Sequence, residues 1–320
     1  MPMSPVGAAF LMAMAGCVPK YAQLSPMEPD GLKTPFPTRT IDVKGVAVAY
    51  VDEGAATDQP PLIFVHGLSS YLGYWEHQLP HFARDRRVLA LDLPGYGASG
   101  RPDAPYTPVW YSELIVDWMD QLQIDKAILI GHSMGGQISM TVALNHPERV
   151  ERLVLAAPAG IERFDAGAAR WMKEYWTEDR ALEATEAELR ATFTTLVFNR
   201  HDDGVERLLE ERVRMSRTRA FQGTSVAVAR SVAGMLDHPV WPRLGQIEAP
   251  TLIVYGTDDR MIPNPVFTGG STRAIAEAGQ RAIPHSELVL IPGAGHTVQH
   301  DAPDDFNRAV EEFLQNRTRP

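Results

Sequence analysis

The sequence predicts an α/β fold in which a mostly parallel, eight-stranded sheet is flanked by helices and interrupted by a helical insertion. Short apolar runs alternate with segments of helical spacing up to Ala157, and the alternation resumes at Thr251. Between Gly160 and Leu244 no buried-strand run occurs. Strands that alternate with helices pair in parallel through right-handed crossovers. With 320 residues, 44% of them hydrophobic, the chain can bury a large core.

The first 16 residues are interpreted as a signal peptide. Val6 to Gly16 form an uncharged apolar run that is too short to span a bilayer and typical of a signal-peptide core. The only cysteine, Cys17, follows Met14-Ala15-Gly16, which resembles a bacterial lipobox. This resemblance implies export, an acylated Cys17 and anchoring to a membrane. Two alternatives stay open: cleavage after Ala13-Met14-Ala15 to give a periplasmic or secreted protein, and a mis-assigned start or cytoplasmic tail.

Residues 17–38 are predicted to be a proline-rich tether, because five prolines break every periodic pattern there. The globular part begins near Arg39. A β-hairpin is expected around Lys44-Gly45, with Asp52-Glu53-Gly54 ending its second strand. The next elements are buried strands and two helices. The predicted ranges are Thr40–Val43, Val46–Val51, Pro61–Val65 and Arg87–Leu91 for strands, the helix Tyr111–Leu122, the strand Lys126–Ile130, the helix Gly136–Asn145 and the strand Arg152–Ala157.

Residues 160–244 are predicted to form a helical cap, since they contain amphipathic segments with interspersed Glu, Asp and Arg. The core domain is then made of residues 39–159 and 245–320. Its second part is expected to supply two strands, Thr251–Tyr255 and Glu287–Ile291, and two helices, Ser271–Arg281 and Asp304–Leu314.

The strongest chemical signal is Gly131-His132-Ser133-Met134-Gly135, which lies between a predicted strand and a predicted helix. Gly-x-Ser-x-Gly at such a junction is the pattern of a nucleophile elbow, whose strained turn presents the serine hydroxyl above the sheet. A serine hydroxyl needs a general base and a group that orients that base. The sequence must therefore supply both downstream of Ser133.

Four ordered motifs together resemble the α/β-hydrolase superfamily over residues 39–314: Asp92-Leu-Pro-Gly-Tyr-Gly97, the elbow, Gly256-Thr-Asp-Asp-Arg-Met-Ile-Pro263 and Gly293-Ala-Gly-His296. The resemblance implies Ser133 as nucleophile, Asp259 as acid and His296 as base. Asp258 competes with Asp259, which fits the superfamily spacing better. Both downstream residues follow predicted strands, at the sheet edge where open α/β folds place their sites.

The resemblance also implies an oxyanion hole made by the backbone N–H groups of Leu68 and Met134. Ser69 follows Leu68 and is expected to line the acyl pocket. Aromatic residues are candidates for the substrate cleft beneath the cap. They are Trp75, Trp171 and Trp176, with Tyr175 beside them.

Composition excludes other classes of function. A net charge of -10 with no Lys/Arg-rich patch argues against binding nucleic acid. A single cysteine excludes an internal disulfide framework and a thiolate metal cluster. No metal and no cofactor is predicted, because no histidine pair has metal-ligand spacing together with a third ligand. The remaining histidines, His77 and His300 among them, are expected to be structural, and His132 to pack beside the strand end.

These observations predict a serine hydrolase that cleaves small carboxylic esters, with an apolar acyl group, through an acyl-enzyme intermediate. The runner-up is a carbon–carbon bond hydrolase of ring-fission products. That subgroup usually has a Ser-Gly-Pro-Gly-like oxyanion loop, Asn before the serine and Trp after the histidine, whereas Leu68-Ser69-Ser70, His132 and Thr297 stand here. A third alternative is a non-catalytic, ligand-binding member of the fold.

Overall fold

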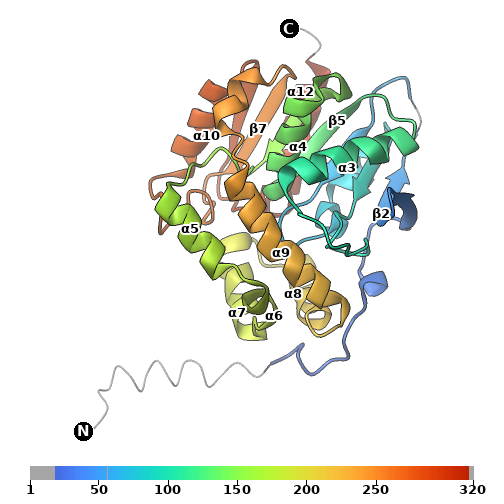
Figure 1. The fold of residues 1–320 in the computed structure, drawn as a ribbon. Coiled ribbons are helices and arrows are strands. Elements are labelled where there is room, and N and C mark those ends of the chain that lie inside the picture. The colour runs from blue at the N-terminus through green and yellow to red at the C-terminus, as the bar shows by residue number, and fades with distance from the viewer. Residues whose placement is uncertain (1–18, 56, 317–320) are drawn as a thin grey trace.

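The computed structural model describes residues 19–55 and 57–316 (Figure 1). The predicted signal peptide and Cys17 lie outside the described residues. Among those described, no helix combines the length and the apolar content that a bilayer span requires.

Eight strands form one sheet in the order β1-β2-β4-β3-β5-β6-β7-β8. The β1–β2 and β2–β4 pairs are antiparallel, and all other pairs are parallel. The predicted fold class is therefore confirmed. The strands are β1 (Arg39–Val43), β2 (Val46–Glu53), β3 (Leu62–Val65), β4 (Val88–Leu91), β5 (Ala127–His132), β6 (Val150–Ala156), β7 (Thr251–Gly256) and β8 (Ser286–Ile291).

The central strands are mostly apolar because helices cover both faces of the sheet. In β5, Leu129 faces one hydrophobic cluster while Ile128 and Ile130 face the other. The first cluster takes side chains from α3 (Pro108–Gln121), α4 (Met134–Asn145) and α10 (Thr272–Ala282). The second takes them from η2 (Leu72–Trp75), α2 (Gln78–Phe82), α11 (Val298–Asp301) and α12 (Pro303–Gln315).

The predicted helical insertion lies between β6 and β7, at the carboxyl ends of the strands (Figure 1). Several of its helices begin where a side chain caps an N–H group of the first turn, as Asp165, Thr185 and Asp202 do. The segment contains α5 (Ala166–Tyr175), α6 (Glu178–Leu182), α7 (Glu186–Thr192), the π-helical turn η4 (Phe193–Val197), α8 (Asp203–Met215) and α9 (Ala220–Asp237). Short 3₁₀ turns complete the fold at η1 (Pro29–Gly31), η3 (Pro147–Arg149) and η5 (Trp241–Gln246).

Residues 19–38, predicted to be a proline-rich tether, pack against the helical insertion. Tyr21 is only 4% exposed and packs with side chains of α7 and α8. The Glu186 carboxylate accepts the N–H groups of Lys20, Tyr21 and Ala22. The prolines prevent a long helix or strand in this segment. Its backbone N–H groups donate instead to a carboxylate of the insertion.

Candidate functional site

Ser133 stands at the tight turn between β5 and α4 with φ 52° and ψ -118°, a conformation that a non-glycine residue rarely adopts. Other backbone segments pack closely against this turn. A Cβ atom at Gly135 would lie 2.2 Å from the Val65 carbonyl oxygen, so only glycine fits there. The Ser133 side chain makes no capping bond to α4. Its hydroxyl is therefore free to interact elsewhere.

The structure brings Ser133, His296 and Asp259 together from three different loops. The Ser133 hydroxyl lies 3.0 Å from His296 Nε2, and His296 Nδ1 lies 2.9 Å from Asp259 Oδ2. Asp259 follows β7 and His296 follows β8. When Nδ1–H donates to the carboxylate, the Nε2 lone pair faces the serine. The result is a continuous hydrogen-bonded chain from a buried carboxylate to an accessible hydroxyl.

The geometry distinguishes Asp259 from Asp258. The side chain of Asp259 has no solvent exposure, and its second oxygen accepts the N–H groups of Met261 and Ile262. Asp258 is exposed, and its carboxylate accepts the hydroxyl of Thr257. Only Asp259 pairs with His296, in agreement with the motif spacing.

The loop after β3 lies directly against the elbow. A Cβ atom at Gly67 would lie 3.2 Å from Ser133 Cβ, so the backbone preceding Leu68 passes beside the serine. His66 anchors the loop, because its Nε2 accepts the N–H of Leu93 at 2.9 Å and its Nδ1–H donates to the Gly67 carbonyl. Burial lowers the pKa of His66 to about 4, which keeps the ring neutral.

His132 is buried beside the end of β5. Its Nε2–H donates to the carbonyl oxygen of His296 at 3.1 Å, and burial holds its pKa well below the ordinary value. The neutral ring thus supports the backbone of the loop that carries His296.

The insertion contributes residues that the sequence did not single out. Asn199 donates through Nδ2 to the carbonyl oxygens of Asp258 and Gly293, which belong to the loops carrying Asp259 and His296. Asp301, at the end of α11, accepts the N–H groups of Gly295 and of Asn199 in the insertion. No local pattern marks these residues, because their partners are backbone groups of distant segments.

The predicted substrate residues lie in different environments. Trp75 is fully buried against Phe64 and Phe306, so the prediction that it contacts substrate is wrong: it fills the core beneath the site. Trp171 is 49% exposed and stacks on Tyr175, whereas Trp176 is half-buried against the main core. Ser69, at φ 56°, lines a cavity of about 30 Å³ between its loop and helices α8 and α9.

Comparisons with known proteins agree with this architecture. Residues 60–303 match the model of a family described as alpha/beta hydrolase fold. Among solved structures, a "probable hydrolytic enzyme" from Pseudomonas aeruginosa PAO1 superposes with a TM-score of 0.80 and is 26% identical, covering 89% of this chain and 96% of that one.

Two curated relatives are similar in sequence. The acetyltransferase component of the acetoin cleaving system of Pseudomonas putida is 31% identical over 80% of this chain, which spans only 63% of that relative's length. The 3-oxoadipate enol-lactonase 2 of Acinetobacter baylyi is 28% identical, covering 86% of this chain and 96% of the relative.

Proposed function

The chain belongs to the alpha/beta hydrolase fold family, and on that premise we propose that it is a serine hydrolase that cleaves carboxylic esters. One observation carries the proposal: the hydrogen-bonded sequence from Ser133 Oγ to His296 Nε2 at 3.0 Å and from His296 Nδ1 to Asp259 Oδ2 at 2.9 Å. This arrangement activates a hydroxyl that is otherwise a weak nucleophile.

In the proposed reaction, Ser133 Oγ attacks the ester carbonyl while His296 Nε2 takes the hydroxyl proton. Asp259 keeps the imidazole in the required tautomer and stabilises the imidazolium that forms. His296 then returns the proton to the departing alkoxide, leaving an acyl group on Ser133. A water molecule, deprotonated by His296, attacks this acyl-enzyme, and His296 returns that proton to Ser133 Oγ as the carboxylic acid leaves.

The backbone N–H groups of Leu68 and Met134 are proposed to bind the oxyanion of the tetrahedral intermediate. Met134 begins α4 directly after the serine, and Leu68 follows the glycine that touches Ser133. Donors fixed in the backbone stabilise the developing charge without reorganisation, and loss of one such donor costs about 10²–10³ in turnover.

The chemistry of the relatives supports acyl substrates. A lactone is a cyclic carboxylic ester, so the name of the enol-lactonase relative describes cleavage of that bond class. The acetyltransferase relative is named for transfer of an acyl group. Both reactions pass the carbonyl carbon through a tetrahedral intermediate, which is what a serine nucleophile and an oxyanion hole accommodate.

Labelling with a fluorophosphonate probe tests the nucleophile. Folded wild-type protein should be labelled, whereas Ser133→Ala should not. Turnover of p-nitrophenyl esters should fall by about 10⁴ or more in Ser133→Ala and in Asp259→Asn. Asp258→Asn, a neutralised carboxylate one position away, is the matched control and should remain within about twofold of wild type. Equal labelling of wild type and Ser133→Ala would disprove the assignment.

A substrate panel tests the bond class. Esters of increasing acyl length should be hydrolysed, while a ring-fission product with a carbon–carbon bond to cleave should not. Rapid cleavage of the ring-fission product together with inert esters would instead support the carbon–carbon hydrolase alternative. Intact folding with no labelling and no turnover of either class would support a non-catalytic binding protein.

A further inference from the structure

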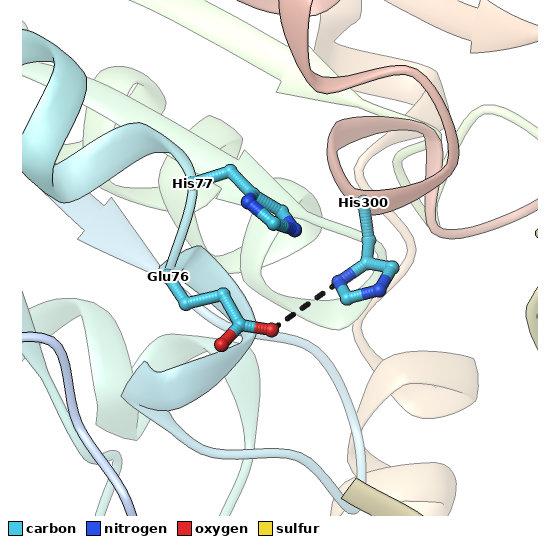
Figure 2. A group of neighbouring side chains, drawn as sticks. All are labelled: Glu76, His77 and His300. Atoms are coloured by element: carbon cyan, nitrogen blue, oxygen red, sulfur yellow. Dashed lines mark ion pairs between the residues drawn. The ribbon is translucent and has the colours of Figure 1, made fainter. Parts of the chain in front are cut away.

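A second cluster of chemically capable side chains lies behind the loop that carries His296. Glu76 closes η2, His77 precedes α2, and His300 belongs to α11. One ligand atom from each lies within 4.8 Å of the others, and Figure 2 shows the three side chains converging. Glu76 Oε1 is 3.7 Å from His300 Nδ1, and the His77 and His300 rings are 4.9 Å apart.

The atoms that converge lack partners. Glu76 Oε1, His77 Nε2 and His300 Nδ1 are each buried without a hydrogen bond. Buried polar atoms are normally satisfied, because each unsatisfied one costs about 1–3 kcal/mol. Three unsatisfied atoms on neighbouring side chains, two of them imidazole nitrogens, indicate a shared ligand. Such a ligand would accept their lone pairs, as a metal ion does.

Neighbouring residues orient these ligand atoms. His300 Nε2–H points to Asp202 Oδ1 at 3.4 Å, which leaves the lone pair on Nδ1. Glu76 Oε2 accepts Arg207 at 2.5 Å, which leaves Oε1 for another partner. A carboxylate behind a histidine is the usual outer-shell arrangement of a metal-binding imidazole.

We propose that Glu76, His77 and His300 bind a divalent first-row transition-metal ion, for which Zn²⁺ is the best match. Two imidazole nitrogens and one carboxylate oxygen suit Zn²⁺, and they disfavour Ca²⁺ and Mg²⁺, which prefer oxygen ligands. The side chain of Glu76 is 25% exposed although its Oε1 is buried, so the site lies just beneath the surface.

The charges around the site fit one divalent ion. Glu76 faces Nδ1 of His300 and Asp202 faces its Nε2. Each carboxylate is paired with one arginine, Arg207 and Arg200 respectively. Arg207 is shared with the buried Glu211, so the surroundings carry a net negative charge before a metal binds. Bound metal would join η2 and α2 to α11, the helix that follows His296. The proposed role is therefore a structural clamp behind the catalytic loop.

The sequence predicted no metal because His77 and His300 lie far apart in the chain. They meet only where α11 packs against η2, and the third ligand, Glu76, adjoins His77 without a recognisable motif. Helix-borne metal motifs place histidines one turn apart, and this cluster has no such pair.

Calorimetric titration of the full chain, stripped with EDTA, with ZnCl₂ tests the proposal. One equivalent should bind saturably with a micromolar or lower Kd, and the melting temperature should rise by about 5 °C when Zn²⁺ exceeds Kd a hundredfold. His77→Gln and Glu76→Gln, both at partly exposed positions, should each weaken binding by more than tenfold. His146→Gln is the matched control, because it removes an imidazole 2.8 Å from a carboxylate, Glu113, on the surface.

Replacing Zn²⁺ by CoCl₂ gives a second measurement that does not depend on hydrolysis. Bound Co²⁺ should show visible absorption in wild type and in His146→Gln, and lose it in His77→Gln. His300→Gln is to be compared in the metal-free state by circular dichroism, so that a loss of fold is separated from a loss of ligand. Zn²⁺ affinity unchanged in folded His77→Gln, or no saturable binding by wild type, would overturn the proposal.

Discussion

At the scale of single residues, the backbone conformation of Ser133 depends on neighbouring positions that leave no room for a side chain. The left-handed φ of Ser133 persists because Gly135 and Gly67 let three backbone segments approach one another. A side chain at Gly135 would have to displace main-chain atoms, which cannot move aside as a flexible side chain can, and one at Gly67 would crowd the side chains of His132 and Ser133. The geometry of the proposed nucleophile therefore depends on residues that carry no chemistry themselves.

Gly135→Ala should disable the proposed site. The new Cβ would lie 2.2 Å from the Val65 carbonyl oxygen and 2.5 Å from that of His66, so the elbow or the oxyanion loop must shift. We expect a loss of stability of about 1–3 kcal/mol and a fall in kcat of about 10²-fold or more, since small displacements of reacting groups are costly. Urea unfolding and p-nitrophenyl ester hydrolysis measure the two effects.

Gly245→Ala is the control for that substitution. A Cβ there would lie 3.8 Å from the nearest atom, an ordinary contact, so both quantities should stay near wild type. Full activity of Gly135→Ala would show that the elbow tolerates a Cβ and that the packing argument fails.

His66 should make stability depend on pH. Its pKa is lowered to about 4 in the folded protein by burial, against about 6.5 in an unfolded chain. Between these values the unfolded chain binds more protons. The contribution of His66 is thus fully present above pH ~6.5 and is lost as pH falls toward ~4, at about 1.4 kcal/mol per pH unit.

Comparison with His66→Gln isolates this contribution from that of Asp92, whose pKa is raised to about 6 by burial and acts in the opposite direction. The stability advantage of wild type over the variant should shrink by about 2 kcal/mol between pH ~7 and pH ~5. Urea unfolding at both pH values measures it. A constant difference between the two proteins would show that His66 does not titrate in this window.

At the scale of elements, the helical insertion holds the two loops that carry Asp259 and His296. Asn199 follows η4 and bonds to the carbonyl oxygens of both loops. Thr297, next to His296, donates its N–H to the Val197 carbonyl at the end of η4. The insertion therefore acts on the site through contacts with the backbone of both loops.

Asn199→Ala should reduce activity more than stability. Loss of two bonds of 3.2–3.3 Å at a partly exposed position should cost about 1 kcal/mol of stability or less. The loops that position Asp259 and His296 would loosen, so kcat should fall by about tenfold with little change in KM. Steady-state kinetics and thermal unfolding separate the two.

Thr195→Ala, in the preceding turn η4, is the matched control because its hydroxyl donates to the Ala191 carbonyl of its own segment. It should leave kcat unchanged. A rise in KM with an unchanged kcat in Asn199→Ala would instead indicate that Asn199 contacts the substrate.

The sequence was most informative where structure is local. The strands β3 to β8 follow from continuous apolar runs, and the elbow follows from five consecutive residues. The order of the motifs also identified the three residues that meet at Ser133. Asn199, Asp301 and the cluster at His300 could not be predicted, because each depends on long-range packing that brings side chains to the backbone or ligand atoms of another segment. Trp75 was misassigned because burial of an aromatic ring cannot be inferred from its proximity to a loop.

At the scale of the whole molecule, the segment before β1 contacts both the insertion and the core and links the two. Its start contacts α7 and α8 through Tyr21, and its end reaches the second core cluster through Phe36. Midway, the Lys33 carbonyl accepts the Tyr71 hydroxyl and its N–H donates to Glu211. This continuous segment therefore contacts both the insertion and the core domain.

Tyr21→Ala tests this fastening. The ring is 4% exposed, its hydroxyl donates to Glu206, and the cations of Lys20 and Arg190 lie over it. Removing it should lower the free energy of unfolding by about 2–4 kcal/mol, since a buried ring and a charge-assisted hydrogen bond are lost together.

Leu24→Ala is the control, because that side chain is 40% exposed and its loss should lower the free energy of unfolding by at most about 0.5 kcal/mol. Because the segment reaches the insertion and the insertion contacts the loops that carry Asp259 and His296, Tyr21→Ala should also lower kcat at temperatures just below melting, where Leu24→Ala should not. If both variants unfold at the same urea concentration as wild type, the contacts of this segment contribute nothing to holding the insertion in place.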